Sequence, residues 1–484
     1  EYDPEKGLMG VPDIDGVEDV KKKILNLLDG LSESRNRSVS FFVSGSYSFL
    51  DRYVVAGSIR MDGADIIGTA NRFSPLWNAS FKYNVYEEGF MKKISWFDEL
   101  AFRLSYGYTG SIDKNALPFG VMTFMSTDEY FGYDIPTYIQ PKNPSVKWQK
   151  KEDRSVGVDF ALLNRRIRGT VNYYNNVTRN LLDTKNLPIS VGVSSIKYNS
   201  SSVRNYGWEF SMNSQVLRTR ELFWKVDFNV GMNKSKVIKT YYKDISEVPK
   251  GYDKTTPVEG ASTNAWFGYR FAGIDPRTGH TLAFVDNSER DKPVGYQRED
   301  GRWVLDMDDV VNKDRESIKE NLGNSYPTVN GGFRTNLAWK NFTFDANFTF
   351  MLGHKITAAY YATSAGGMVS SASQNVLRKE TTRWRKPGDI TDIPVYSAGG
   401  EFSSLYSEWY DLKLESGDFL TSISLGYRVP SKICQKFSLT SLRVNFNVRD
   451  VFTISGYSGL DPENFGGFSY PNSKKYMISL NIGI

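Results

Sequence analysis

Cysteine and histidine are almost absent from this 484-residue sequence. It contains one cysteine, Cys434, and two histidines, His280 and His354. A single cysteine excludes an intrachain disulfide, and so few of both residues exclude zinc sites of the Cys/His type. A Ser-His-Asp triad would need one of the two histidines, and neither has a motif around it. We therefore predict that the protein is not an enzyme and carries no cofactor, with a lipase or protease as an alternative.

Long apolar runs are also missing. No stretch approaches the ~18 consecutive apolar residues of a membrane-spanning helix. The net charge is only +5, and lysine and arginine are interleaved with aspartate and glutamate, so we expect no nucleic-acid partner. The sequence opens on EYDPEKGLMG, without an initiator methionine or an apolar leader. We expect either that a leader has been removed or that the gene product begins earlier.

Acidic residues are close together in LDMDDVVNKDRE, which holds Asp306, Asp308 and Asp309. This stretch lacks the glycine and the closing glutamate spacing of an EF-hand loop. We expect a solvated acidic loop and no bound metal, with Ca²⁺ as the open alternative.

What the sequence does contain is alternation with a period of two. In residues 441–449, Leu442, Val444, Phe446 and Val448 alternate with polar or charged neighbours. Successive side chains of a strand point to opposite faces, so such a strand has one apolar and one polar face. Aromatic residues make up 14% of the chain, which suits the aromatic girdles of an outer-membrane barrel.

Strand length and connection length separate two interpretations. A soluble antiparallel sheet with one wet face would also alternate. However, the strands reach the ~9–11 residues that a tilted membrane-spanning strand needs. Very short and very long connections also alternate along the chain, in the same way as the short periplasmic turns and long extracellular loops of outer-membrane barrels. We therefore predict an all-β, transmembrane antiparallel β-barrel in the bacterial outer membrane, in contact with its lipid.

Thirteen strands are predicted: 36–49, 52–62, 72–86, 98–109, 151–163, 166–178, 203–216, 222–236, 328–339, 342–353, 416–428, 440–452 and 474–484. If the last strand runs towards the periplasm, the outer side receives loops 63–71, 110–150, 179–202, 237–327, 354–415 and 453–473. The longest loop is expected to carry its own hairpin, with DPRTG as the turn.

An odd number of strands does not fit a complete single-chain bacterial barrel, which has an even number. We therefore expect the chain to be the C-terminal part of a larger barrel. Residues 1–35 are then an extracellular loop segment, and residues 36–484 are the barrel part.

Several segments resemble the SusC/RagA family of TonB-dependent transporters. They include YSFLDRYVVAGSIRMDGAD, FDELAFRLSYGYTGS, VRNYGWEFSMNS, FGYRFAGIDPRTG and the closing YPNSKKYMISLNIGI. Each segment is weak alone, but their order and spacing are specific. One departure is the last residue, because the family commonly ends on an aromatic residue and this chain ends on Ile484.

The resemblance implies a 22-stranded barrel, of which about nine strands would be missing here. The family's plug and TonB box have no counterpart in this chain. Implied partners are a SusD-like surface lipoprotein, the TonB complex, and an oligosaccharide or peptide substrate, in a dimer of SusC–SusD pairs. The implied function is TonB-dependent active import, and a passive porin-like or structural barrel is the alternative.

Two groups of side chains are candidates for contact with a substrate. Charged residues on the polar strand faces are expected to face the lumen or the plug: Arg103, Lys225, Asp227, Arg334, Arg443 and Arg449. Aromatic residues of the outer loops are expected to stack on sugars or peptides, although loop packing is the plainer interpretation for each one. These residues are Tyr130, Phe131, Tyr133, Tyr138, Tyr360, Tyr361, Tyr406 and Trp409, with Tyr410 beside them.

Overall fold

A computed structural model describes most of the chain. The described residues are 2–3, 7–8, 36–68, 71–113, 118–127, 134–140, 142–187, 190, 195–247, 257–288, 290–307, 318–355, 381–395, 418–455 and 472–484.

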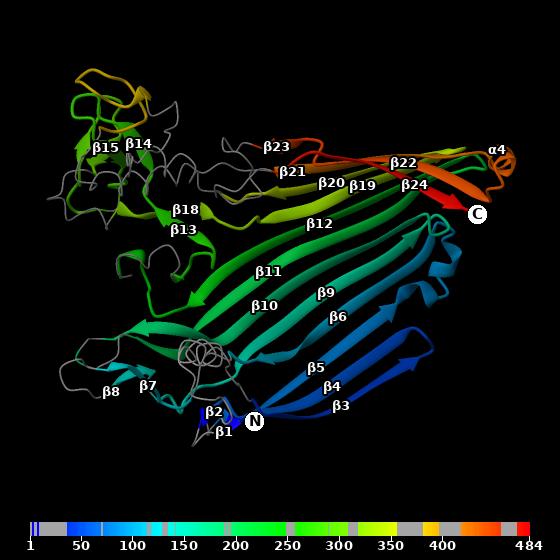
Figure 1. Cartoon of the computed structure of the whole chain (residues 1–484). Helices are drawn as coiled ribbons and strands as arrows, with labels where there is room; N and C mark the ends of the chain where they lie inside the picture. The colour runs from blue at the N-terminus through cyan, green and yellow to red at the C-terminus, as the bar shows by residue number, and fades with distance from the viewer. Residues whose placement is uncertain are drawn as a thin grey trace.

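One large antiparallel sheet dominates the molecule and curves like part of a barrel wall (Figure 1). Its continuous path has the thirteen predicted strands in sequence order, and β23 (Thr453–Ser455) pairs with β21 beside them. The path consists of β3 (Ser38–Phe49), β4 (Tyr53–Ala64), β5 (Phe73–Asn84), β6 (Phe97–Ser111), β9 (Gln149–Leu162), β10 (Ile167–Asn186), β11 (Ser195–Arg218), β12 (Leu222–Lys239), β19 (Val329–Trp339), β20 (Phe342–Leu352), β21 (Asp418–Arg428), β22 (Ser441–Arg449) and β24 (Lys475–Gly483).

The two edge strands, β3 and β24, do not pair with each other. Within the described residues, β3 pairs with β4 alone and β24 with β22 alone. The wall is therefore open between these edges, as a thirteen-stranded part of a larger barrel would be.

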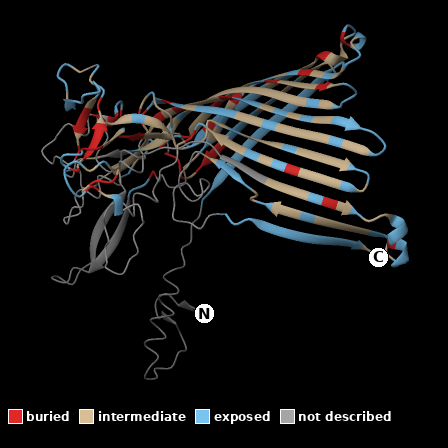
Figure 2. Ribbon diagram, turned by 90° about the horizontal axis from the view of Figure 1, so that it is seen from above, coloured by how far each residue is buried: buried red, intermediate tan, exposed pale blue. Residues whose placement is uncertain are grey.

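Short connections gather at one end of the sheet, where Figure 1 shows α4 (Ser431–Lys436) and the C-terminus. The β3–β4 turn uses Leu50 and Asp51 with φ values of 53° and 55°, as a two-residue type I′ hairpin requires. Long connections leave the opposite end. Figure 2 shows that the buried residues gather mainly at this loop-bearing end.

The prediction of an outer loop over residues 179–202 is wrong for much of this segment. Strands β10 and β11 continue through most of it, and Leu182 pairs with Asn199. This part of the hairpin packs against other outer segments, since Leu182 contacts a buried cluster that includes Ile67 and Trp148, and Ser201 is buried. Its two faces do not divide lipid from water, so alternation is not required there. Backbone pairing alone continues the strands, and the sequence pattern ends too early.

The strand register separates an apolar face from a polar face, as predicted. Along the path from β19 to β22, Leu337 pairs with Phe344, Phe344 with Leu425, and Leu425 with Phe446. Such outward side chains stay exposed on interior strands too; Leu425 is 51% exposed and Trp208 53%. Exposing apolar surface to water is unfavourable by about 25 cal/mol per Å². A whole sheet face of exposed apolar side chains therefore suits a lipid environment. None of the helices in the described ranges is long and apolar enough to cross a bilayer.

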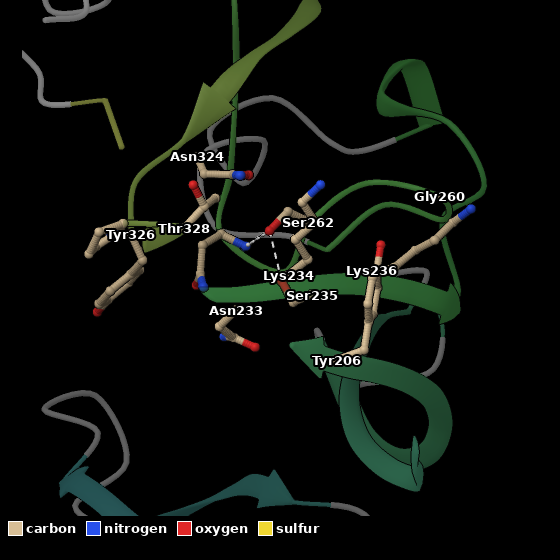
Figure 3. Close-up of a pocket in the computed structure, with 12 residues that line it drawn as sticks. Tyr206, Asn233, Lys234, Ser235, Lys236, Gly260, Ser262, Asn324, Tyr326 and Thr328 are labelled. Atoms are coloured by element: carbon tan, nitrogen blue, oxygen red, sulfur yellow. Dashed lines mark hydrogen bonds between the residues drawn. The ribbon is translucent and has the colours of Figure 1, made fainter. Parts of the chain in front are cut away.

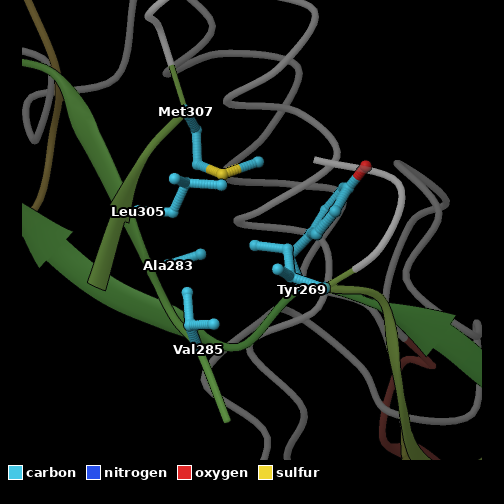
Figure 4. Close-up of a cluster of buried hydrophobic side chains, with 6 residues drawn as sticks. Tyr269, Ala283, Val285, Leu305 and Met307 are labelled. Atoms are coloured by element: carbon cyan, nitrogen blue, oxygen red, sulfur yellow. The ribbon is translucent and has the colours of Figure 1, made fainter. Parts of the chain in front are cut away.

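A small domain stands on the long connection between β12 and β19. Its strands are β13 (Ala265–Gly268) with β18 (Glu320–Asn324), and β14 (Phe271–Ile274), β15 (Thr281–Phe284), β17 (Trp303–Asp306) and β16 (Tyr296–Gln297). Buried Tyr269, Ala283, Val285, Leu305 and Met307 form much of its core (Figure 4). The predicted hairpin across DPRTG is confirmed, because β14 and β15 pair on either side of that turn.

Candidate functional site

The polar face of the sheet holds one well-connected charged group at Arg103. Arg103 Nη2 donates to Asp159 Oδ1 at 2.8 Å and to Asn172 Oδ1 at 2.9 Å. Its Nε lies 2.7 Å from Asp159 Oδ2. The three side chains come from β6, β9 and β10, which are neighbours in the sheet. A planar guanidinium group matches a carboxylate in this way. The wall therefore presents a fixed group made of one cation, one carboxylate and one amide.

Gly157 makes room for this group. A Cβ atom there would lie 2.5 Å from Asn172 Oδ1 and 3.0 Å from Arg103 Nη2. Any larger residue would push one of these side chains aside. Sequence reasoning did not single out Gly157, because the alternation of β9 shows only that position 157 belongs to the polar face.

The other predicted lumen-facing charges lie on the same face. Lys225 Nζ lies 2.9 Å from Asp227 Oδ1, and Arg334 Nη2 lies 3.3 Å from Asp345 Oδ1. Asn336 Nδ2 also donates to Asp345 Oδ1 at 2.7 Å. The register places Arg443 opposite Asn481, and Arg449 opposite Lys475, on this face. The inner wall is therefore polar and mixed in charge, as the alternation predicted.

Most of the predicted substrate-contacting aromatics lie outside the described residues. These are Tyr130, Phe131, Tyr133, Tyr360, Tyr361, Tyr406, Trp409 and Tyr410. Tyr138 lies in β8 (Asp134–Gln140), opposite Met122 of β7 (Val121–Thr127), in a hairpin of the outer connection 112–148. Their role stays a prediction.

The small outer domain has a hollow that the sequence did not indicate. Its volume is about 600 Å³, and Arg270, Phe284, Arg302, Trp303 and Glu320 are among its lining residues. The Arg302 guanidinium carbon lies 4.6 Å from the centre of the Phe284 ring. Arg270 Nε lies 2.7 Å from Glu320 Oε1. Aromatic faces beside charged groups can hold a polar organic molecule by stacking and hydrogen bonds.

Asp275 fixes the turn between β14 and β15. Its side chain is 7% exposed, and its Oδ1 accepts a 2.8 Å hydrogen bond from the backbone N–H of Arg277. Burial raises the pKa of Asp275, but the hydrogen bonds and charge of Arg277 outweigh burial and hold that pKa below its usual value. The turn therefore depends on an ionised carboxylate.

The predicted acidic loop is described only at its first member. Asp306 Oδ2 lies 2.9 Å from His280 Nδ1, while Asp308 and Asp309 lie outside the described residues. No group of three or more His, Cys, Asp or Glu side chains that could hold a metal ion occurs within the described ranges.

The family described as "TonB dependent receptor-like, beta-barrel" matches residues 28–308. This chain belongs to that family. Its fold is therefore that of an outer-membrane β-barrel, in agreement with the apolar outer face and polar inner face of the sheet.

Two curated relatives and one solved structure agree with this assignment. TonB-dependent receptor P3 of Formosa agariphila is 25% identical over 464 residues, covering 92% of this chain and 43% of the relative. TonB-dependent receptor SusC of Bacteroides thetaiotaomicron is 25% identical over 475 residues, covering 93% of this chain and 44% of the relative. The structure of the RagAB peptide transporter superposes with a TM-score of 0.76 at 22% identity, covering 92% and 48%.

The resemblance to the SusC/RagA family is thus confirmed, and its members are outer-membrane proteins. The chain spans just under half the length of these relatives.

Proposed function

We propose that this TonB-dependent receptor barrel takes part in active import of an oligosaccharide or oligopeptide across the bacterial outer membrane. The observation that carries the proposal is the division of the sheet into an apolar outer face and a polar inner wall of paired charges. A wall lined by Arg103–Asp159, Lys225–Asp227 and Arg334–Asp345 exposes polar groups and charges of both signs to a wet passage. Neutral sugars and mixed-charge peptides suit such a surface.

The outer connections are the proposed place of substrate capture. The hollow between Phe284, Arg302 and Trp303 and the loop aromatics Tyr130, Phe131, Tyr133, Tyr138, Tyr360, Tyr361, Tyr406 and Trp409 would supply stacking faces. A SusD-like surface lipoprotein would cover this side, and pairs of the two proteins would form dimers. Residues 1–35 would belong to the same outer surface, and residues 36–484 to the barrel.

Energy for import would come from the TonB complex in the periplasm, acting through a part of the protein outside this chain. The relatives' names support this proposal, since SusC is a TonB-dependent receptor and RagAB a peptide transporter.

The test is uptake by cells that produce the complete protein, with TonB present or deleted. Labelled oligosaccharides and oligopeptides of graded length would be supplied at concentrations below those at which diffusion dominates. Uptake that stops without TonB supports active import. Uptake that continues at the same rate without TonB would favour the passive porin-like alternative.

A further inference from the structure

The outward face of the sheet changes character at its loop-bearing end. Strands β9 to β12 carry apolar residues over most of this face, but the same faces then become basic. The strand register aligns the change across neighbours: Arg204 lies opposite Lys236, and Tyr206 opposite Lys234. We name this cluster the outer basic band; it consists of Arg154, Arg179, Arg204, Lys234 and Lys236.

The residues of β12 show how far the outer basic band lies from the apolar belt of the barrel. The apolar positions of this strand run from Leu222 to Met232 on the outward face. About ten residues at ~3.4 Å each, tilted by about 40°, span roughly 26 Å, close to the ~25 Å apolar belt of outer-membrane barrels. Lys234 and Lys236 follow Met232 directly. They therefore lie about 5 to 10 Å beyond the belt, at the depth of lipid headgroups.

One carboxylate of the protein, that of Glu152, neutralises only part of the positive charge of the outer basic band. Glu152 accepts a 3.1 Å hydrogen bond from Arg154 Nε, and its Oε2 lies 3.6 Å from Arg179 Nη2. Arg204 stands over the Tyr206 ring at 4.9 Å from its centre, and its Nε donates to Asn175. The described residues offer Lys234 and Lys236 no ion pair, and both lysines are exposed.

A hollow of about 240 Å³ lies beside the two lysines. It forms because β12 continues past Met232, where its pairing with β19 ends at Val329. Figure 3 shows Lys236 and Tyr206 on one side of the hollow, and Asn324, Tyr326 and Thr328 on the other. Ammonium, amide and hydroxyl groups converge here, which suits a ligand with both anionic oxygens and sugar hydroxyls.

We propose that the outer basic band and its hollow bind the phosphorylated sugar headgroup of a glycolipid in the outer leaflet. The lysines face the side of the wall that lipid occupies, and they lie at headgroup depth. A phosphate there would neutralise Lys234 and Lys236, while the Asn324 amide would meet the sugar. The proposal concerns the outside of the barrel, so it holds whether transport is active or passive.

The experiment measures lipid binding by the complete protein, purified in an uncharged detergent. The probe is diphosphorylated lipid A, compared with the same lipid after removal of its phosphates, by native mass spectrometry. The test variant is Arg204→Gln/Lys234→Gln/Lys236→Gln. The matched control is Arg165→Gln/Arg218→Gln/Arg220→Gln, which removes three exposed cations from the short-turn end. Lys234→Arg/Lys236→Arg keeps the charge, and heat-resistant gel migration shows that every variant is folded.

We expect the test variant to bind the diphosphorylated probe about a hundredfold more weakly, because each cation near an anionic lipid surface contributes a factor of about five. The control and the arginine variant should bind like the wild type, and the dephosphorylated probe should bind weakly to all of them. Equal binding of both probes, or unchanged binding by the test variant, would overturn the proposal. So would equally strong displacement by inorganic phosphate, which would show that the site does not recognise the lipid.

Discussion

The Arg103 guanidinium and the Asp159 carboxylate face each other across β6 and β9, with Nη2 2.8 Å from Oδ1 and Nε 2.7 Å from Oδ2. The pair lies on the inner wall, and the two side chains are 40% and 25% exposed. Such a half-exposed pair contributes little to stability, about 0.2–1 kcal/mol. Its main effect is to fix the charge pattern that a passing substrate meets.

Asp159→Asn should therefore alter transport more than folding. We expect the free energy of unfolding in detergent to fall by less than about 1 kcal/mol, measured by tryptophan fluorescence in urea. A double-mutant cycle with Arg103→Ala isolates the pairwise contribution. A coupling free energy well above this range would show that the pair is a structural element of the wall instead.

Gly157→Ala should disturb the same group by crowding. The new Cβ would meet Asn172 Oδ1 at 2.5 Å and Arg103 Nη2 at 3.0 Å, and we expect a loss of about 1–2 kcal/mol in unfolding free energy. Gly231→Ala is the matched control, because Gly231 lies on the polar face of the interior strand β12 and a Cβ added there would meet nothing closer than Asn330 Oδ1 at 3.5 Å. That control should stay within about 0.5 kcal/mol of the wild type. Equal effects at both glycines would contradict the close packing around Gly157.

Asp275→Asn should loosen the turn between β14 and β15 at neutral pH. The pKa of Asp275 is lowered in the folded state, so its ionised form stabilises the turn above its unfolded pKa of about 4. That contribution is lost as the pH falls through the lower folded pKa. At pH 7 we expect about 1–2 kcal/mol less protection, measured by amide hydrogen exchange at residues 277–281.

The difference between wild type and Asp275→Asn should begin to shrink below about pH 4 and disappear only once the pH is below the lowered folded pKa. Asp300→Asn is the control, because Asp300 binds Arg302 at the same spacing but on an exposed turn. Hydrogen bonds from Arg302 lower the pKa of Asp300, yet water screens this pair and its effect should be smaller. A difference at Asp275 that persisted unchanged at low pH would mean that ionisation is not what holds the turn.

Arg302→Ala should weaken ligand capture with little effect on folding. Its guanidinium stands 4.6 Å from the centre of the Phe284 ring, and its side chain is 62% exposed. Loss of one such contact should reduce the affinity for the imported oligosaccharide or oligopeptide about three- to tenfold. The measurement is calorimetry with the complete protein and its partner. Arg298→Ala, on the same small domain but not among the residues lining the hollow, should leave affinity unchanged. Equal affinities for both variants would remove the hollow from the proposed capture site.

Much of the fold could be predicted from the sequence, because each membrane-spanning strand contacts lipid with one face and water with the other. Lipid on one face and water on the other impose strict alternation, so the strands, their faces and the polar wall carrying Arg103 and Arg334 were predicted correctly. The pattern failed in 179–202, where β10 and β11 extend beyond the predicted strands and pack against other outer segments instead of separating lipid from water. The loop aromatics could be named from the sequence, but it could not predict which of them come together, because no periodicity constrains loops.

The sequence by itself determined which residues face lipid and which face water, since that depends only on a period of two along each strand. Only the tertiary structure decided which charges meet. Arg103 and Asp159 are 56 positions apart, and Arg204 is aligned with Lys236 by the register of β11 and β12. Register sets how far one strand slides along another, and no single strand contains that information. The charge pairs, the space left by Gly157 and the outer basic band therefore exist only in the assembled sheet.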